Sequence, residues 1–281
     1  MSTLPAAAPG TTVLPSLFVS HGSPALALAS GPVIQAWQRL AGDLPRPPAI
    51  LAVSAHWQAR QPTVGGSLWP DTIHDFGGFP APLYELRYDA PGLPGLAASV
   101  AGLSGALIAP DQGLDHGAWM PLRAMYPTAD IPVVPLALLY RQGPRQHFEL
   151  GRSLARLRQD GVLILASGGI THNLYDLAWG AGEDEAVPAY AREFQAWIHD
   201  ALAARDLDRL LDYRRLAPHA ERAHPSEEHL LPLFVALGAA WDEGDMDRPY
   251  AGFADGALAM DLYRFGGTTP ATPATPAAPA A

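Results

Sequence analysis

Residues 14–24 read LPSLFVSHGSP, and residues 50–57 read ILAVSAHW. In each stretch, a short run of apolar residues leads directly into a histidine. Apolar runs of this length, rich in branched and aromatic residues, are typical of strands buried on both faces of a sheet. The same pattern predicts five strands, at residues 13–19, 49–55, 106–109, 131–138 and 162–166.

Segments with helical periodicity separate these strands. We expect six helices, at residues 33–41, 93–103, 119–125, 144–158, 186–204 and 226–240. Strands that alternate with helices indicate an α/β fold. The expected architecture is a single-domain sandwich, in which a central mixed, mostly parallel sheet is covered by helices on both faces.

The two ends of the chain differ in composition from the rest. Residues 1–12 are small and proline-rich, and residues 266–281 read GGTTPATPATPAAPAA. Neither stretch has enough large apolar residues to build a core. We therefore predict two disordered tails around one catalytic domain at residues 13–265, and expect the tail from Gly266 to be dispensable for folding.

The composition excludes several classes of protein. The 281 residues include no cysteine and no lysine, which excludes thiolate metal sites, cysteine nucleophiles and Schiff-base lysines. The net charge of −10 argues against a nucleic acid or an anionic membrane as partner. Since no apolar run is as long as a membrane span and the N-terminus does not resemble a secretory signal, we expect a cytoplasmic protein.

Three histidines follow predicted strands. His21 and His56 come directly after the first two, and His172 comes shortly after the apolar run VLILA. In an open α/β sheet, ligands and catalytic groups gather at the carboxyl ends of the strands. We therefore expect these three side chains to lie close together.

A fourth histidine, His229, lies in the segment AHPSEEHLLPLFVALGAA. We expect a helix capped by Ser226, with Glu227 and Glu228 in its first turn and His229 about one turn from its start. His116, in GLDHGAW, is expected in a loop. Any one of these histidines is more often structural than a ligand. Together they favour a metal site, because neutral imidazole is the commonest metal ligand near pH 7. The others look ordinary, and His147 and His199 are expected on polar helix faces.

Six motifs occur in a fixed order along the chain: FVSHGSP, AVSAHW, TIHDFGGFP, DHGAW, SGGITHNL and HPSEEHLLPLFVALGA. Together they resemble the DODA-type extradiol ring-opening dioxygenases of the class III superfamily, from about residue 14 to residue 265. The resemblance implies an α/β sandwich with one metal ion held by His21, His56 and His229. It also implies that His172 is the acid/base group or a further ligand.

The resemblance further implies the reaction. A catechol, DOPA-like in structure, would be opened by dioxygen to a semialdehyde, with His172 and His116 as catalytic groups and with His74, Asp75 and His116 near the substrate. Bacterial members are commonly described as zinc-binding, whereas ring opening calls for Fe(II). Three histidines also suit catalytic zinc. A zinc-dependent hydrolase and a non-catalytic metal-containing binding module therefore remain alternatives.

Overall fold

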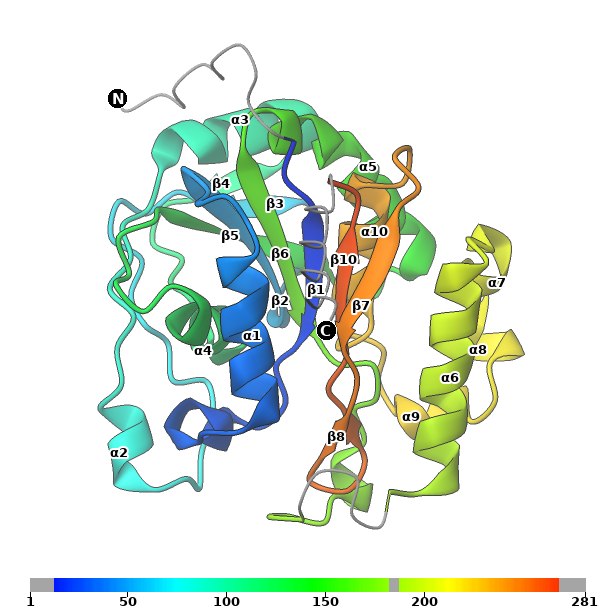
Figure 1. Ribbon diagram of the computed structural model, residues 1–281. Coiled ribbons are helices and arrows are strands. Elements are labelled where there is room, and N and C mark those ends of the chain that lie inside the picture. Colours follow the sequence, from blue (N-terminus) through cyan, green and yellow to red (C-terminus); the bar gives the residue numbers. More distant parts are fainter. Residues whose placement is uncertain (1–12, 182–186, 268–281) are drawn as a thin grey trace, which may run out of the picture.

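A mixed eight-stranded sheet forms the centre of the computed structural model, which describes residues 13–181 and 187–267 (Figure 1). The four central strands run parallel, and the sheet becomes antiparallel where β3 meets β5 and beyond β1. The predicted mixed, mostly parallel sheet is thus confirmed. Its strands, in spatial order, are β4 (Leu107–Ala109), β3 (Thr63–Gly65), β5 (Val133–Leu139), β2 (Ala49–Ala59), β6 (Val162–Gly168), β1 (Ser16–Ser20), β10 (Leu262–Phe265) and β7 (Met246–Tyr250).

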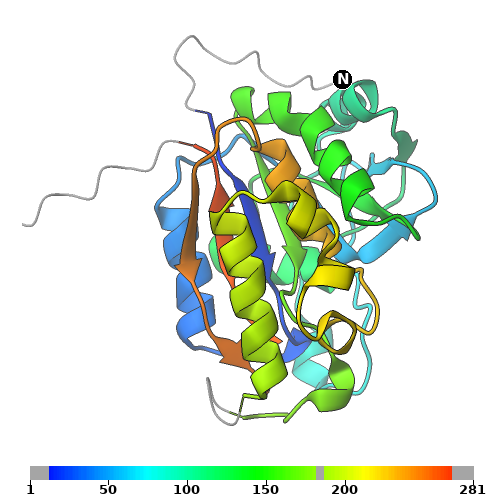
Figure 2. The same ribbon diagram turned by 90° about the vertical axis from the view of Figure 1, so that its right-hand side faces the viewer.

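Helices cover both faces of this sheet because successive side chains of each strand point to opposite sides. Leu17 and Val19 of β1 pack with α1 (Pro32–Gly42) and α4 (His116–Met125). Phe18 packs on the other side, where the helices are α3 (Pro94–Ser104), α5 (Pro144–Gln159), α6 (Ala189–Ala203) and α10 (Leu231–Ala239). Figure 2 shows α1 on one side of the sheet and α5 with α10 on the other.

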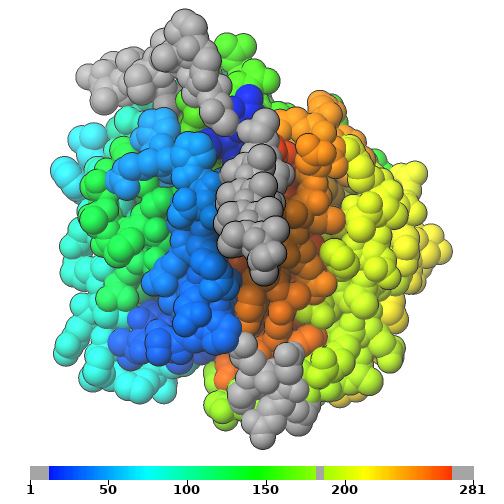
Figure 3. Space-filling view, in the orientation of Figure 1, coloured from blue at the N-terminus to red at the C-terminus, as the bar shows by residue number. Residues whose placement is uncertain are grey.

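Shorter elements complete the described chain. They are η1 (Pro24–Leu28), α2 (Ala81–Tyr84), η2 (Leu174–Asp176), α7 (Leu207–Leu211), α8 (Tyr213–Leu216), α9 (Ala220–Ala223), and the small sheet of β8 (Phe253–Ala254) and β9 (Leu258–Ala259). On the surface in Figure 3, the blue residues of α1, the orange C-terminal strands and the yellow α6–α8 region form successive bands. Among the described helices, none is long and apolar enough to cross a membrane.

All five predicted strands and all six predicted helices are present, but two boundaries were wrong in ways that matter. The second strand continues to Ala59, so His56 lies inside β2 rather than after it. The last predicted helix begins at Leu231, and the Ser226 hydroxyl donates to Glu228 instead of capping it. Strands β3 and β7–β10 were missed, because they are short and lack a clear apolar run.

The predicted tails lie almost entirely outside the described residues. Residues 1–12 and 268–281 are not described. Ala186, the first residue of the helix predicted at residues 186–204, also lies outside the described residues. Gly266 and Gly267 are described, and their backbone N–H groups donate to Asp245 O and Glu243 Oε2. These two glycines therefore belong to the fold, and the domain limits of 13–265 remain a prediction.

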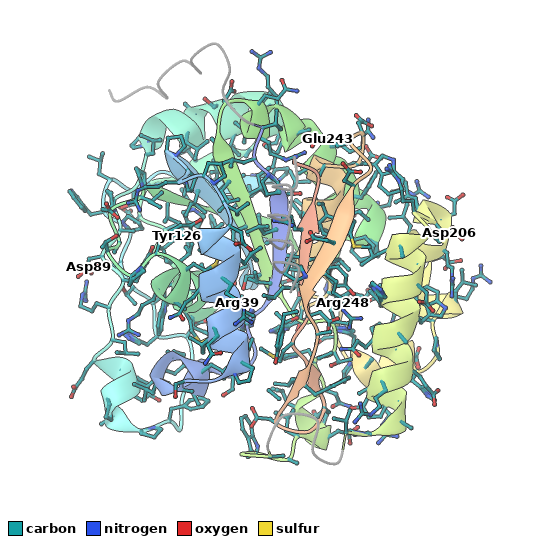
Figure 4. All side chains as sticks on the ribbon, in the orientation of Figure 1. Arg39, Asp89, Tyr126, Asp206, Glu243 and Arg248 are labelled. Carbon is teal, nitrogen blue, oxygen red and sulfur yellow. The ribbon has the colours of Figure 1, made fainter. Side chains whose placement is uncertain are left out.

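A buried arginine ties the sheet to both neighbouring helices. The Arg158 side chain, at the end of α5, is only 1% exposed. It donates to Leu14 O before β1, to Ala239 O at the end of α10, and to both carboxylate oxygens of Glu243 (labelled in Figure 4). Five N–H donors in a rigid plane suit this set of acceptors, so Arg158 satisfies groups from three segments at once.

We expect Arg158→Met to lower the free energy of unfolding by about 2–4 kcal/mol, because it leaves buried carbonyl oxygens without a donor. The control is Arg152→Met. Arg152 pairs with Asp242 on the surface, where both side chains are over a third exposed, so its loss should change stability by less than about 1 kcal/mol. The measurement is urea denaturation at pH 7.

The effect of Arg158→Met should also shrink in acid. Burial raises the pKa of Glu243, but hydrogen bonds from Arg158 and the Gly267 N–H outweigh this and lower it below 4.5. The pair therefore stabilises the fold above about pH 4.5 and is lost as the pH falls through the lowered pKa. If Arg158→Met and Arg152→Met lose the same free energy of unfolding at pH 7, the structural role given to Arg158 is wrong.

Candidate active site

The first histidine of the site is placed by the pairing of β1 with β6. His21 directly follows β1, and its backbone N–H donates to Gly168 O at the carboxyl end of β6. The next residue, Gly22, has φ +62°, a conformation that favours glycine. A Cβ there would lie 2.8 Å from the Met260 side chain, so glycine lets the chain turn sharply away and leaves the imidazole at the sheet edge.

His56 is placed by a bulge in β2. Val53 pairs with Leu136 of β5 and Gln58 pairs with Leu138, so four residues of β2 lie opposite a single residue of β5. A bulge bends its strand and redirects side chains. The pairing of β2 with β6 also stops at Ser54. His56 is therefore directed into the site from within the strand, although its backbone does not end there.

His116 is the first residue of α4, not a loop residue as predicted. Asp115 caps this helix by accepting from the Ala118 N–H, and it also accepts from the Ser54 hydroxyl. Ser54 in turn accepts from the His56 backbone N–H. A buried polar chain thus connects the bulge of β2 to the start of α4, and it sets His116 beside His56.

His229 lies two residues before α10 rather than one turn inside it. Its backbone oxygen accepts from the Gly169 N–H, and a Cβ on Gly168 would lie 2.1 Å from that oxygen. The two glycines of SGGITHNL therefore allow the segment carrying His229 to approach the end of β6. Glu228, predicted for the first helical turn, instead accepts from His229 Nδ1 at 3.0 Å.

The rings of His21, His56 and His229 form a nearly equilateral triangle. Their centroids are separated by 5.0 Å (His21–His56), 5.3 Å (His21–His229) and 4.9 Å (His56–His229). Three imidazoles that bind one ion through bonds of about 2.1 Å place their ring centres roughly 5 Å apart. His116 lies nearer to His56, at 4.0 Å between centroids, and nitrogens of His21, His56 and His116 also lie within 4.8 Å of one another. The same holds for ligand atoms of His172, Glu228 and His229. The ring spacing of His21, His56 and His229 adds a third arrangement that could hold a metal ion.

In this cluster, the outer ring nitrogens are held by oxygen atoms. Nδ1 of His21 contacts Ser167 Oγ at 2.9 Å, and Nδ1 of His229 contacts Glu228. One carboxylate, Asp75, lies 3.4 Å from His56 Nδ1 and 3.0 Å from His116 Nδ1. A carboxylate can only accept, so Nδ1 of His56 and of His229 carries hydrogen, and Nε2 of each of these rings, when neutral, is left with its lone pair. The Ser167 hydroxyl can donate or accept, so His21 can take either tautomer. This is the arrangement that orients histidines around a metal.

The inner nitrogens of the cluster lie close together. Nε2 of His21 and Nε2 of His56 lie 3.0 Å apart, and Nε2 of His229 is buried with no hydrogen-bond partner among the described residues. Two nitrogens bound at about 2.1 Å to one ion and at a right angle are about 3 Å apart. The donor set therefore fits a divalent metal with room for further ligands.

Burial keeps four histidines of the site neutral. It lowers the pKa of His56 to about 3, helped by repulsion from His116, and it lowers the pKa of His21 and His229 well below 6.5. Burial also lowers the pKa of His172 to about 4. Neutral imidazole is the form that binds a metal or accepts a proton, so the site is ready for both at pH 7.

His172 stacks flat on His229, with 3.3 Å between the ring centroids and an angle of 5°. Its backbone N–H donates to Ala223 O, which fixes the loop after β6. The five histidines open onto a cavity of about 670 Å³. Apart from them, the cavity is lined largely by apolar side chains, namely those of Phe76, Phe79, Leu174, Leu177, Trp179 and Leu258.

Of the three residues predicted to contact substrate, only His116 lines the cavity. His74 lies behind the wall, where its Nε2 contacts Leu86 O, and Asp75 holds the two histidines. His147, predicted on a polar helix face, is fully buried and bonded through both ring nitrogens, whereas His199 is only half-buried. Sequence reasoning missed Ser54, Asp115 and Ser167, whose partners are distant in the chain.

The comparisons with known proteins agree with this geometry. Residues 16–255 match the family model of the catalytic LigB subunit of aromatic ring-opening dioxygenase. The chain is 39% identical over 261 residues to the 4,5-DOPA dioxygenase extradiol of Escherichia coli (strain K12), covering 89% of this chain and 94% of that protein. The protein of the same name from Beta vulgaris is 36% identical over 263 residues, covering 90% and 97%. A crystal structure of the Escherichia coli K12 protein JW3007 matches with a TM-score of 0.74 and 32% identity, covering 90% of this chain and 100% of that one.

We expect Gly117→Ala to destabilise the metal-free protein by about 1–3 kcal/mol, although alanine is the better helix former. The added Cβ would lie 2.4 Å from Ser54 Oγ and 3.0 Å from His56 Cδ2, inside the packed cluster. Gly102→Ala, in α3, is the control. No atom lies within 4 Å of its added Cβ, so it should stabilise by about 0.5–1 kcal/mol. If urea denaturation shows that both variants gain stability, or that both lose it, this account of the cluster is wrong.

Proposed function

The chain belongs to the family of catalytic LigB subunits of aromatic ring-opening dioxygenases, and we propose that it cleaves a catechol beside its two hydroxyl-bearing carbons, with dioxygen as co-substrate. The proposed substrate has the carbon skeleton of DOPA, the compound named in its relatives, and the product is a ring-opened semialdehyde. The observation that carries the proposal is the cluster of five histidines that lines one cavity, with nitrogens close enough to hold a metal ion.

We assign His21, His56 and His229 as the metal ligands. The near-equal ring separations and the buried, partnerless Nε2 of His229 support this triad over the one that contains His116. Fe(II) is the metal proposed for catalysis. It would supply the electron transfer that allows triplet dioxygen to react with a catecholate, which the filled d-shell of zinc does not permit.

The remaining histidines handle the substrate. His172 lines the cavity, and its ring is held parallel to that of His229, so it can take a proton from one catechol hydroxyl and later return one. His116 lines the same cavity, with its Nδ1 held by Asp75, which leaves Nε2 free to contact the substrate. The apolar wall above them excludes water from the reacting groups.

We expect Fe(II) to support turnover and Zn(II) not to, even though zinc binds nitrogen ligands more tightly and should dominate after aerobic purification. The protein is stripped of metal and reloaded anaerobically with each ion. Oxygen uptake and the yellow semialdehyde are then followed with DOPA and other catechols. Equal turnover with iron-free zinc, or none with iron on any catechol, would refute the dioxygenase proposal. Ester or amide hydrolysis by the zinc form would favour the hydrolase alternative instead.

Single substitutions should separate the ligands from the acid/base group. His56→Ala and His229→Ala should lose most bound metal, whereas His116→Ala should retain it. His172→Gln should keep the metal and lose turnover by roughly 10²–10⁴-fold, as is typical of a general acid–base group. Metal content is measured by elemental analysis on folded protein. If His116→Ala loses metal and His229→Ala does not, the other triad is correct, and metal loss in His172→Gln would make His172 a ligand.

A further inference from the structure

The cavity has two chemically distinct regions. Its floor carries the five histidines. Phe76 and Leu258 form the inner wall, and Phe76 meets the His116 ring edge-on at 5.5 Å between centroids. Leu174 and Trp179 form the outer wall, where their side chains are 57% and 63% exposed. A catechol ring bound at the floor therefore directs its substituent along an apolar wall.

The charged groups around this wall do not favour a carboxylate. All 18 arginines of the chain lie within the described residues, and none of them lines the cavity. Arg222 forms an ion pair with Asp176 of η2, and its guanidinium lies 4.2 Å over the ring of Tyr190, so it is engaged outside the cavity lining. The acidic residue that lines the cavity, Glu228, would repel an anion.

From this arrangement we infer the substrate class: catechols whose ring substituent is uncharged and apolar, in preference to those that carry a carboxylate. The inference rests on the proposed catechol cleavage and narrows its substrate. An apolar substituent gains from burial against Leu174, Leu177 and Trp179. A carboxylate in the same place would gain no cationic partner from the cavity lining, and any water that it lost would not be replaced. DOPA itself, with a carboxylate and an ammonium group, is bound less well than its alkyl counterpart.

The inference is tested by anaerobic calorimetry on the Fe(II)-loaded protein, which measures binding without turnover. The probes are 4-ethylcatechol, dopamine, DOPA and 3-(3,4-dihydroxyphenyl)propionate. We expect 4-ethylcatechol to bind at least about tenfold more tightly than the propionate, with DOPA between them. Equal or tighter binding of the propionate, or no binding of 4-ethylcatechol, would overturn the inference.

A second experiment introduces a positive charge at the mouth of the cavity. Leu174→Arg places a cation at the mouth, where the native side chain is more than half exposed and the fold should tolerate the change. It should improve propionate binding relative to 4-ethylcatechol by roughly tenfold, and Leu174→Gln, which is polar but uncharged, should not. An equal shift in both variants would argue against charge as the discriminating property.

Oxygen uptake by the same samples distinguishes the proposed catechol cleavage from the inferred substrate preference. If 4-ethylcatechol binds most tightly but no catechol consumes oxygen, the proposed function fails and the binding preference stands. If catechols are cleaved with kcat/KM highest for the propionate, the proposed function stands and the preference is refuted.

Discussion

Two imidazole nitrogens facing each other at 3.0 Å, Nε2 of His21 and Nε2 of His56, are the constraint around which this sheet edge is organised. Their opposite nitrogens contact Ser167 Oγ and the Asp75 carboxylate, which orients both rings so that the two Nε2 atoms face inward. Without a metal, one N–H···N hydrogen bond can join two such neutral rings, whereas a metal ion would accept a lone pair from each. Burial lowers the pKa of both rings and keeps them neutral, which is the form that binds a metal.

That constraint explains several features that would otherwise look unrelated. Parallel pairing of β1, β6 and β2 brings their carboxyl ends to one edge, but strands alone would leave the histidines too far apart. The bulge in β2 moves His56 inward, and Gly168 allows the backbone of His229 to come close to the end of β6. The polar chain from His56 N–H through Ser54 to Asp115 then links strand and helix. Because each step depends on close approach, the histidine cluster tolerates little added volume.

The sequence predicts the sheet and much of the site because apolar runs are local signals. His21 and His172 were placed correctly, since each follows a run that forms a strand wherever it packs. His56 was misplaced because its bulge depends on pairing with β5, which no local pattern encodes. His229 was misplaced because the apolar run after it obscures the helix start, although Pro232 in the first turn was a usable signal. The role of Asp75 depends on contacts 19 and 41 residues away along the chain, as counted from His56 and His116, so only the fold could reveal it.

The floor and the wall of the cavity differ in how well they tolerate substitutions. At the floor, a single added methyl on Gly117 or Gly168 would collide with a backbone or a site side chain. At the wall, Leu174 and Trp179 lie on the loop that follows His172 and are more than half exposed. Substitutions there leave core packing intact, because an exposed side chain contributes little buried area. Under the proposed function, the chemistry would depend on the sheet and the choice of ring substituent on the segment after His172, so one could change without the other.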